Sequence, residues 1–310
     1  MADFTTTITD AGVIDADELT AFEQGIIYGV SPELVADQVA TIRVERMAKI
    51  IQFAKYANLS AATTALNDGE DVTSAALADS TSTLTPAEQG NVVTLAHLAN
   101  LESGGKAWEA AGFLIGRNAG TSLDALAIAA LEAFTTTLIY PNAATAVTNL
   151  ATSDNLDKTF ANRLYNKLAR TNVPAISGGR TYMGIAHDDC LHDLRNDTAN
   201  GGWTDVSKYA DPQSVLANEV GMYAGIRWLR SSNVTVTADS NGTIDSYKVN
   251  VVGFNALGKG ESQTLDFRMT GPFDKLGRFK NIGWYWVGKY GVIDTANMVQ
   301  GICASSVGAN

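Results

Sequence analysis

The sequence predicts an α+β fold, with helices first and most of the strands later. The first observation is a run of apolar and small residues at helical spacing from Lys106 to about Leu138. The second is a change to strand-like patterns after Gly225, including Asn241-Gly242, a favoured two-residue hairpin turn. The chain has no internal repeat of fixed period, which argues against solenoids and propellers.

Composition is that of a soluble globular protein with an acidic surface. The chain has 310 residues, of which 45% are hydrophobic and 18% charged, and its net charge is −11. This length predicts roughly two domains. An acidic surface repels phosphates, which disfavours a dedicated nucleic-acid reader. Two cysteines, Cys190 and Cys303, are too few for a disulfide framework, and the absence of a long apolar run predicts no transmembrane helix.

The first 40 residues form an acidic segment that contains no Lys or Arg. One interpretation is a frayed tail. The other, which we favour, is an extended arm whose apolar residues, such as Phe4, Phe22 and Tyr28, dock on the body or on a neighbouring subunit. The segment lacks the basic and apolar regions of a signal peptide, so we expect synthesis in the cytosol.

Residues 48–100 resemble a long hairpin. Ile51 and Phe53 begin one arm, and Val93 and Leu95 lie in the other. The tract between them, 61–85, is rich in Ala, Thr, Ser and acids and has no Lys or Arg. Because an isolated two-stranded ribbon is marginal in water, we expect this extension to need a partner surface.

The longest predicted helix follows. Ser103 is a candidate N-cap, and Pro141 is expected to end the helix, which would cover Lys106 to about Leu138. Its periodic positions are Trp108, Gly112, Ile115, Ala119, Leu123, Leu126, Ala130 and Phe134. The glycines at 112, 116 and 120 form a smooth face, which favours close packing against a sheet.

Shorter elements complete the prediction. The helices are expected at Asp157–Ala169, from Asp188 or Asp189 to Arg195, and from Asp211-Pro212 onward. The strands are expected at Thr181–Ile185, Asn233–Thr237, Thr243–Asn250, Gln263–Met269 and Ile282–Val287.

Residues 253–259 match the first seven positions of a phosphate-binding loop, and the eighth position, 260, does not. There, Gly260 replaces the Ser or Thr that would hold magnesium. The following residues resemble a strand, whereas a phosphate loop must open a helix. A glycine turn between strands is therefore the better interpretation.

The segment 187–193 contains two of the three histidines and one cysteine, with acids between them. Zinc needs about four converging ligands, and no second Cys/His group exists to complete the set. On a helix, Cys190 would also point away from the face shared by 189 and 192 or 193. A helix start capped by acids explains the residues better than a metal site does.

Other catalytic patterns are missing. The chain has no G-x-S-x-G elbow and no Cys with an ordered His and Asn. We expect His97 to be a core or interface histidine. The basic residues Lys275, Arg278, Lys280 and Lys289 are expected to balance acids on a neighbouring molecule. The sequence thus predicts no catalytic, cofactor-binding or metal-ligating residues, no cofactor and no enzyme.

The stretch 181–234 resembles the central segment of major capsid proteins from tailed bacteriophages, in particular the N4-like family. That family has a short strand ending in His, a helix with an Asp-Leu-Arg core, a Trp and a Tyr, a Glu-x-Gly turn and a Gly-x-Arg strand. The matching positions here are Ile185, His187, Asp193-Leu194-Arg195, Trp203, Tyr209, Glu219-Gly221 and Gly225-Arg227. Asp188 departs from the family, which usually has Pro there. Upstream, residues 66–70 and 89–93 are similar to the family's extended loop, so the resemblance spans roughly 45–305.

The resemblance implies the HK97-type capsid fold. Its parts would be an N-terminal arm (1–45), an extended loop (46–100), a peripheral domain with a long spine helix (101–140 and 246–285) and an axial domain (141–245 and 286–310). The implied function is a structural major capsid protein that self-assembles as hexamers and pentamers into an icosahedral head around double-stranded DNA.

The resemblance also implies partners and a location. The partners would be other copies of the chain, the portal protein, scaffold or decoration proteins, and packaged DNA held without sequence specificity; no membrane is expected. The location would be the virion, after synthesis in the bacterial host cytoplasm. The alternatives are a phage decoration or other virion structural protein, and a metal- or nucleotide-dependent enzyme.

Overall fold

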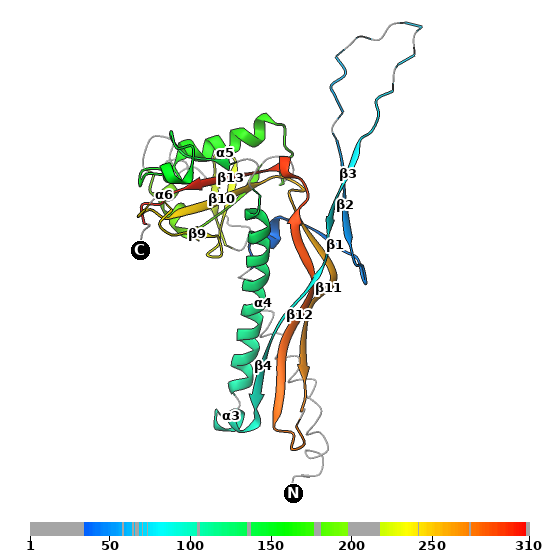
Figure 1. Cartoon of the computed structure of the whole chain (residues 1–310), viewed down its shortest axis with the longest axis vertical. Coiled ribbons are helices and arrows are strands. Elements are labelled where there is room, and N and C mark those ends of the chain that lie inside the picture. Colours follow the sequence, from blue (N-terminus) through cyan, green and yellow to red (C-terminus); the bar gives the residue numbers. More distant parts are fainter. Residues whose placement is uncertain are drawn as a thin grey trace.

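The computed structural model describes residues 34–307, with gaps at 58, 64, 66–67, 70, 73, 104–105, 135–137, 177–180, 198–217, 241 and 273. Figure 1 shows three parts: a globular part, a long limb made of one helix beside a narrow sheet, and a hairpin that projects from the end of that sheet. Most of the expected arm (1–33), the helix expected from Asp211-Pro212, and Trp203 and Tyr209 lie outside the described residues.

The limb is a four-stranded sheet with the strand order β1-β11-β12-β4. The strands are β1 (Ala40–Val44), β11 (Leu257–Thr270), β12 (Phe279–Val292) and β4 (Ala87–Ala96). The short helix α3 (His97–Glu102) follows β4, and α4 (Lys106–Glu132) then runs back along β4 and β12. The strands predicted at Gln263–Met269 and Ile282–Val287 are confirmed, and both extend further than expected.

The long helix is confirmed, and its small residues lie on the buried face. Gly112, Gly116 and Gly120 are all buried, which allows the helix to approach the sheet closely. The expected end near Leu138 is wrong, because α4 ends at Glu132. Leu138 and Ile139 instead form β5 and pair with Gln300 and Gly301, so backbone pairing across the sheet replaces a further helical turn.

The globular part surrounds a seven-stranded sheet with the strand order β5-β13-β10-β6-β8-β7, to which β9 is added beside β10. The remaining bounds are β13 (Met298–Cys303), β10 (Ser246–Val252), β6 (Tyr182–Ala186), β8 (Ile226–Arg230), β7 (Glu219–Tyr223) and β9 (Val236–Thr237). Two helices, α5 (Lys158–Arg170) and α6 (Asp188–Asn196), complete it. The described residues also contain three short 3-10 turns, the first of which packs against α4 of the limb. These turns are η2 (Ala36–Val39), η3 (Val147–Asn149) and η4 (Thr295–Asn297).

The helices α5 and α6 are found where the sequence predicts them. Asp157 caps α5, because its carboxylate accepts a hydrogen bond from the Phe160 amide at 2.7 Å. The expected acidic cap of α6 is wrong: His187 is the N-cap, and its Nδ1 accepts from the Asp189 amide at 3.3 Å. The strand predicted at Thr181–Ile185 is confirmed as β6.

Two predicted hairpins have different pairing in the structure. In the first, β2 (Ile51–Tyr56) pairs with β3 (Asp79–Leu84), whereas Val93 and Leu95 belong to β4 and pair with β12. The second is wider than the Asn-Gly pair predicts, because Thr237 faces Ser246 and residues 238–245 connect the strands. In the first hairpin, the observed pairing buries Ile51, Phe53 and Leu84.

The two sheets also shift the expected domain limits. β10 lies in the seven-stranded sheet between β13 and β6, although 246–285 was expected to belong with the long helix. β12 continues in the four-stranded sheet to Val292, although 286–310 was expected in the other domain. A β-strand cannot leave its hydrogen-bonded ladder midway without unpairing its backbone, so the change of sheet occurs in the turns after β10 and β12.

The tight β7–β8 turn gives a first prediction. Ala224 and Gly225 both have positive φ, and a Cβ on Gly225 would lie 2.5 Å from the Tyr165 ring. Gly242 also has positive φ, but nothing lies within 4 Å of the Cβ position. We expect Gly225→Ala to destabilise the fold by about 1–3 kcal/mol more than Gly242→Ala, because only the first adds a steric clash to the backbone strain. Guanidinium unfolding of both variants measures the difference, and equal midpoints would contradict it.

Candidate assembly surfaces

The base of the β2–β3 hairpin is attached to the limb by a small apolar cluster. Ile51, Phe53 and Leu84 are buried there against Ala48 and Ile293. The strands beneath carry glycines that make room for these side chains. A Cβ on Gly260 would lie 3.2 Å from Ile51 Cδ1, and one on Gly291 would lie 2.4 Å from Leu84 Cδ2.

This contact explains Gly258 and Gly260, the last two glycines of the motif at 253–260. No helix follows it; residues from Leu257 onward belong to β11, as the strand interpretation predicts. Successive side chains of a strand point to opposite faces. Gly258 and Gly260 therefore face the hairpin base, whereas Lys259 and Glu261 face the core on the other side. The glycines have a packing role, and Lys259 is engaged in ion pairs within the core.

Beyond its base, the described part of the hairpin is not buried by the rest of the chain. Every described residue from 57 to 78 is exposed, and none of them belongs to a helix or strand. Several large apolar side chains face solvent, with Tyr56, Leu59 and Leu77 each more than 60% exposed. Figure 1 shows the extension standing clear of the rest of the molecule. Apolar side chains on a ribbon of this kind are typical of an interaction surface.

A second exposed apolar surface lies at the far end of the limb. It consists of Leu98 and Leu101 on α3 and Leu276 in the turn between β11 and β12, and α3 buries none of its residues. We call it the distal apolar end. A third surface follows the edge strand β1, where Ile42, Val44 and the fully exposed Met47 face solvent. Edge strands that expose apolar side chains are sites for association with another chain.

The described part of the N-terminal segment is held by a buried carboxylate on α4. Asp124 accepts hydrogen bonds from the amides of Val35 and Ala36 at 2.9 and 2.7 Å. Its other oxygen accepts from Ser231 Oγ and Asn233 Nδ2 at 2.9 and 2.8 Å. A buried carboxylate is stable only when it is hydrogen-bonded, and these four donors come from two segments distant in the sequence.

A charged network fixes the same segment to the sheet. Asp37 on η2 lies 3.0 Å from Lys259 Nζ and accepts a hydrogen bond from the Tyr290 hydroxyl at 2.8 Å. Lys259 also contacts Glu261, which accepts from Trp286 Nε1 at 2.9 Å. Burial, together with the nearby Asp37 carboxylate, raises the pKa of Tyr290, so its hydroxyl stays a donor at neutral pH.

The sequence analysis assigned no role to Asp124. The missed signal is its spacing. Gly120, Asp124 and Ile128 follow one another at intervals of four, so the carboxylate lies on the buried face. Glu132 continues this series and accepts from the Thr235 amide at 2.9 Å. An acid within an apolar helical stripe is a sign of a buried hydrogen-bonding role.

In the structure, the two histidines and the cysteine of the 187–193 segment have different partners. His187 caps α6, His192 contacts Asn196 at 2.8 Å, and Cys190 faces inward to Cys303. Among the described residues, no three His, Cys, Asp or Glu side chains gather as metal ligands would. No helix in the described part of the chain is long and apolar enough to span a membrane.

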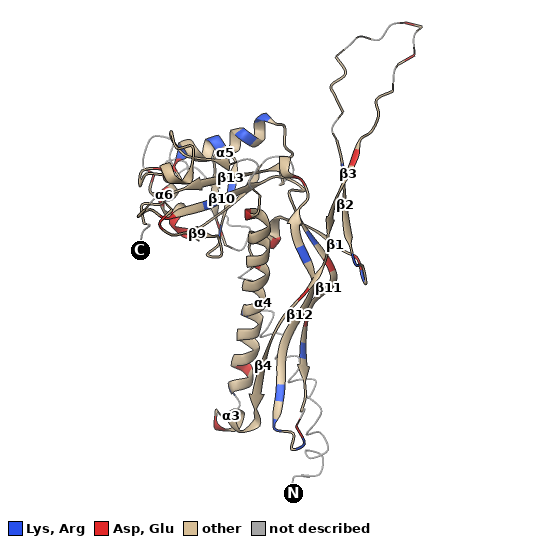
Figure 2. Ribbon diagram, viewed as in Figure 1, with Lys and Arg blue, Asp and Glu red and all other residues tan. Residues whose placement is uncertain are grey.

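His97 and the basic residues between 275 and 289 lie at or near the surface. His97 is exposed, so it is not a core histidine of this chain. Arg278 pairs with Asp274 at 2.9 Å, and Lys280 lies 5.5 Å from the centre of the Trp108 ring. Lys275 and Lys289 are exposed and have no ion pair within the described residues. Figure 2 shows further basic residues along α5, and the sequence has no Lys or Arg from 56 to 105.

The Asp124 contacts give a second prediction. Replacing Asp124 with Ala leaves four donors without their acceptor, two of them backbone amides, so we expect a loss of about 2–4 kcal/mol in stability. Hydrogen exchange at the Val35 and Ala36 amides should rise in the same variant. Glu109→Ala is the matched control, because Glu109 is an exposed acid on the same helix. Unchanged protection of the two amides in Asp124→Ala would contradict the anchoring role.

No protein-family model and no curated protein matches the chain. Solved structures do match. A chain in the capsid of Ralstonia phage GP4 has 14% identity and a TM-score of 0.72, covering 86% of this chain and 87% of its own. A chain of the cyanophage Pam1 capsid has 12% identity and a TM-score of 0.65, covering 90% and 92%.

A third match is a chain from the head of Helicobacter pylori bacteriophage KHP40. It has 11% identity and a TM-score of 0.64, and the match covers 89% of this chain and 91% of the other. At such low identity the likeness concerns the fold. The chain has the fold of these phage capsid chains, which confirms the α+β, HK97-type architecture implied by the resemblance, while membership of the N4-like family stays a prediction.

Proposed function

We propose that this chain is a structural major capsid protein of a tailed phage, which self-assembles into an icosahedral shell of hexamers and pentamers around double-stranded DNA. The observation that carries the proposal is the hairpin extension, whose described residues from 57 to 78 are all exposed. The capsid fold supports it, because chains of that fold form the phage heads named above. In the shell, the hairpin lies across a neighbouring copy, and the N-terminal arm contacts others.

The energetic argument is burial shared between chains. A single molecule leaves the hairpin, the distal apolar end and the β1 edge in contact with water. Each contact with a neighbour removes only part of that apolar surface. Several weak contacts per subunit nevertheless become strong together, because formation of one raises the effective concentration for the next. Closed symmetry then limits growth to a shell instead of a fibre.

Charge supports the same arrangement. The hairpin and its flanks, from 56 to 105, contain acids but no Lys or Arg. The exposed Lys275 and Lys289 are available to pair with acids of a neighbouring copy. The net charge of −11 limits adhesion of packaged DNA to the inner wall, so contact with DNA is non-specific.

Each of the two sheets forms the centre of one domain. The peripheral domain consists of α4 and the four-stranded sheet, the axial domain of the seven-stranded sheet with α5 and α6, and the arm and extended loop are attached to the first. Copies of the chain are its main partners, with the portal protein and scaffold or decoration proteins as further ones. The protein is made in the host cytoplasm, acts in the virion, and has no catalytic role.

The first test is the size of the assembled protein. Purified chain is expected to sediment as shells or as capsomers and to show closed particles by electron microscopy. A discrete small oligomer under all conditions would contradict the capsid proposal and would favour a decoration or other virion protein.

The second test addresses the hairpin. Residues 58–77 are replaced by Asn-Gly, which leaves β2, β3 and the Ala57–Ala78 hydrogen bond in place. We expect a folded protein with an unchanged melting temperature that remains as monomers or capsomers, because the surface shared between neighbours is lost. Shells of wild-type size and stability from this variant would remove the role given to the hairpin, and the capsid proposal would then depend on the fold alone.

A further inference from the structure

The only two cysteines of the chain meet in the core of the globular part. Cys190 on α6 and Cys303 at the end of β13 are 113 residues apart, and their sulfur atoms lie 3.6 Å from each other. Both side chains are completely buried. A disulfide has an S–S distance of about 2.05 Å, so the sulfurs are about 1.5 Å from bonding distance.

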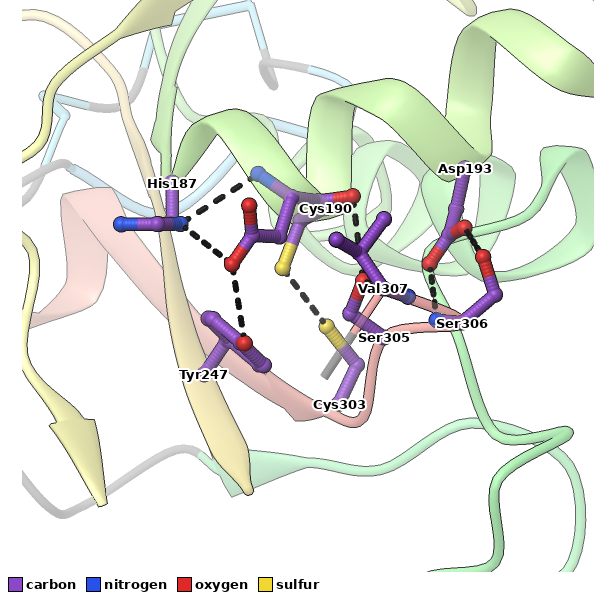
Figure 3. Close-up of polar contacts among 9 residues, drawn as sticks. His187, Cys190, Asp193, Tyr247, Cys303, Ser305, Ser306 and Val307 are labelled. Carbon is purple, nitrogen blue, oxygen red and sulfur yellow. Dashed lines mark hydrogen bonds and ion pairs between the residues drawn. The ribbon is translucent and has the colours of Figure 1, made fainter. Parts of the chain in front are cut away.

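The backbones on either side of the thiols are held together by hydrogen bonds (Figure 3). Ser305 Oγ donates to the Asp189 carbonyl at 3.2 Å, and the Ser306 amide donates to the Asp193 carboxylate at 2.8 Å. On the other side, the Tyr247 hydroxyl donates to Asp189 at 2.9 Å, and Tyr247 is the direct cross-strand neighbour of Cys303. The two sulfurs are therefore kept in contact by groups that do not depend on a bond between them.

We propose that Cys190 and Cys303 form an oxidation site, at which a small peroxide converts the two thiols into an intrachain disulfide that ties α6 to β13. No other cysteine exists in the chain to compete for either sulfur. The inference concerns the single chain and does not depend on its assembly into shells.

The reaction balances with hydrogen peroxide as the oxidant. One sulfur, after losing its proton, attacks a peroxide oxygen; the O–O bond breaks, water leaves and a sulfenic acid remains. The second sulfur then attacks the first, the S–O bond breaks, the S–S bond forms and a second water leaves. Two thiols lose two electrons, and one peroxide is reduced to two waters.

Burial decides which oxidants reach the two thiols and how fast the thiols are oxidised. Larger oxidants such as oxidised glutathione have no direct access to completely buried sulfurs, whereas hydrogen peroxide is close to water in size. Burial and the hydrogen bond with Cys303 raise the pKa of Cys190, so its thiol stays protonated at neutral pH. Oxidation is therefore slow near neutrality and faster at alkaline pH, where more thiolate forms.

The bond would close a long loop in the unfolded chain. For a separation of this size, loop-closure entropy predicts that the folding equilibrium constant rises on the order of 10³-fold. Thiol reductants such as dithiothreitol would reverse the change.

The test uses the full wild-type chain. The protein is treated with hydrogen peroxide, quenched with catalase, unfolded in guanidinium with N-ethylmaleimide, and digested for peptide mapping. We expect both thiols to escape alkylation together, a cross-linked peptide that contains residues 190 and 303, and a guanidinium midpoint that rises and is restored by dithiothreitol. Peptide mapping replaces intact mass as the readout, because peroxide also oxidises exposed methionines such as Met47.

Cys303→Ser is the control. With one thiol left, the same treatment should produce oxygen adducts of Cys190 and no protected pair. Three results with the wild-type chain would overturn the proposal: both thiols still alkylated after treatment, sulfinic or sulfonic acids instead of a disulfide, or disulfides only between different molecules. The wild-type map decides the question even if the variant fails to fold.

Discussion

The carboxylate of Asp124 holds together three segments on which the arrangement of the molecule depends. It lies on the long helix and accepts hydrogen bonds from two backbone amides at the start of the described N-terminal segment. It also accepts hydrogen bonds from two side chains in the turn after β8. The helix packs on the four-stranded sheet, while that turn belongs to the seven-stranded one. One fully satisfied buried charge thus links the limb, the globular part and the arm.

The limb is built so that its own core and the hairpin base use opposite faces of β11. Lys259 and Glu261 face the core and connect to Asp37 and Trp286, whereas Gly258 and Gly260 leave space for the hairpin. The hairpin is consequently attached firmly at its base, and beyond it every described residue from 57 to 78 is exposed. This difference makes it suited to reach a second molecule, because a firm base fixes the direction in which the extension points.

The sequence predicts an element correctly when the residues that mark it lie close together along the chain. The helices α4, α5 and α6 and the strand β6 are marked by periodicity and by flanking residues within a few positions, and all of them are present. The largest errors lie in strand pairing, whereas those at the end of α4 and the cap of α6 concern single boundaries. The hairpin was assigned the strand at Val93 and Leu95, although β3 is the partner of β2 and β4 belongs to β12. Strand pairing depends on residues far apart in the sequence, which a local pattern does not contain.

The sequence by itself determined the fold class, the long helix, the polar extension and the absence of a complete catalytic motif, since each depends on residue type and short spacing. Only the tertiary structure decided how the strands divide between two sheets, that Asp124 binds distant segments, and that Cys190 meets Cys303. These contacts form because buried polar groups must find partners and apolar faces must be covered. Which distant group supplies the partner is decided by packing in three dimensions.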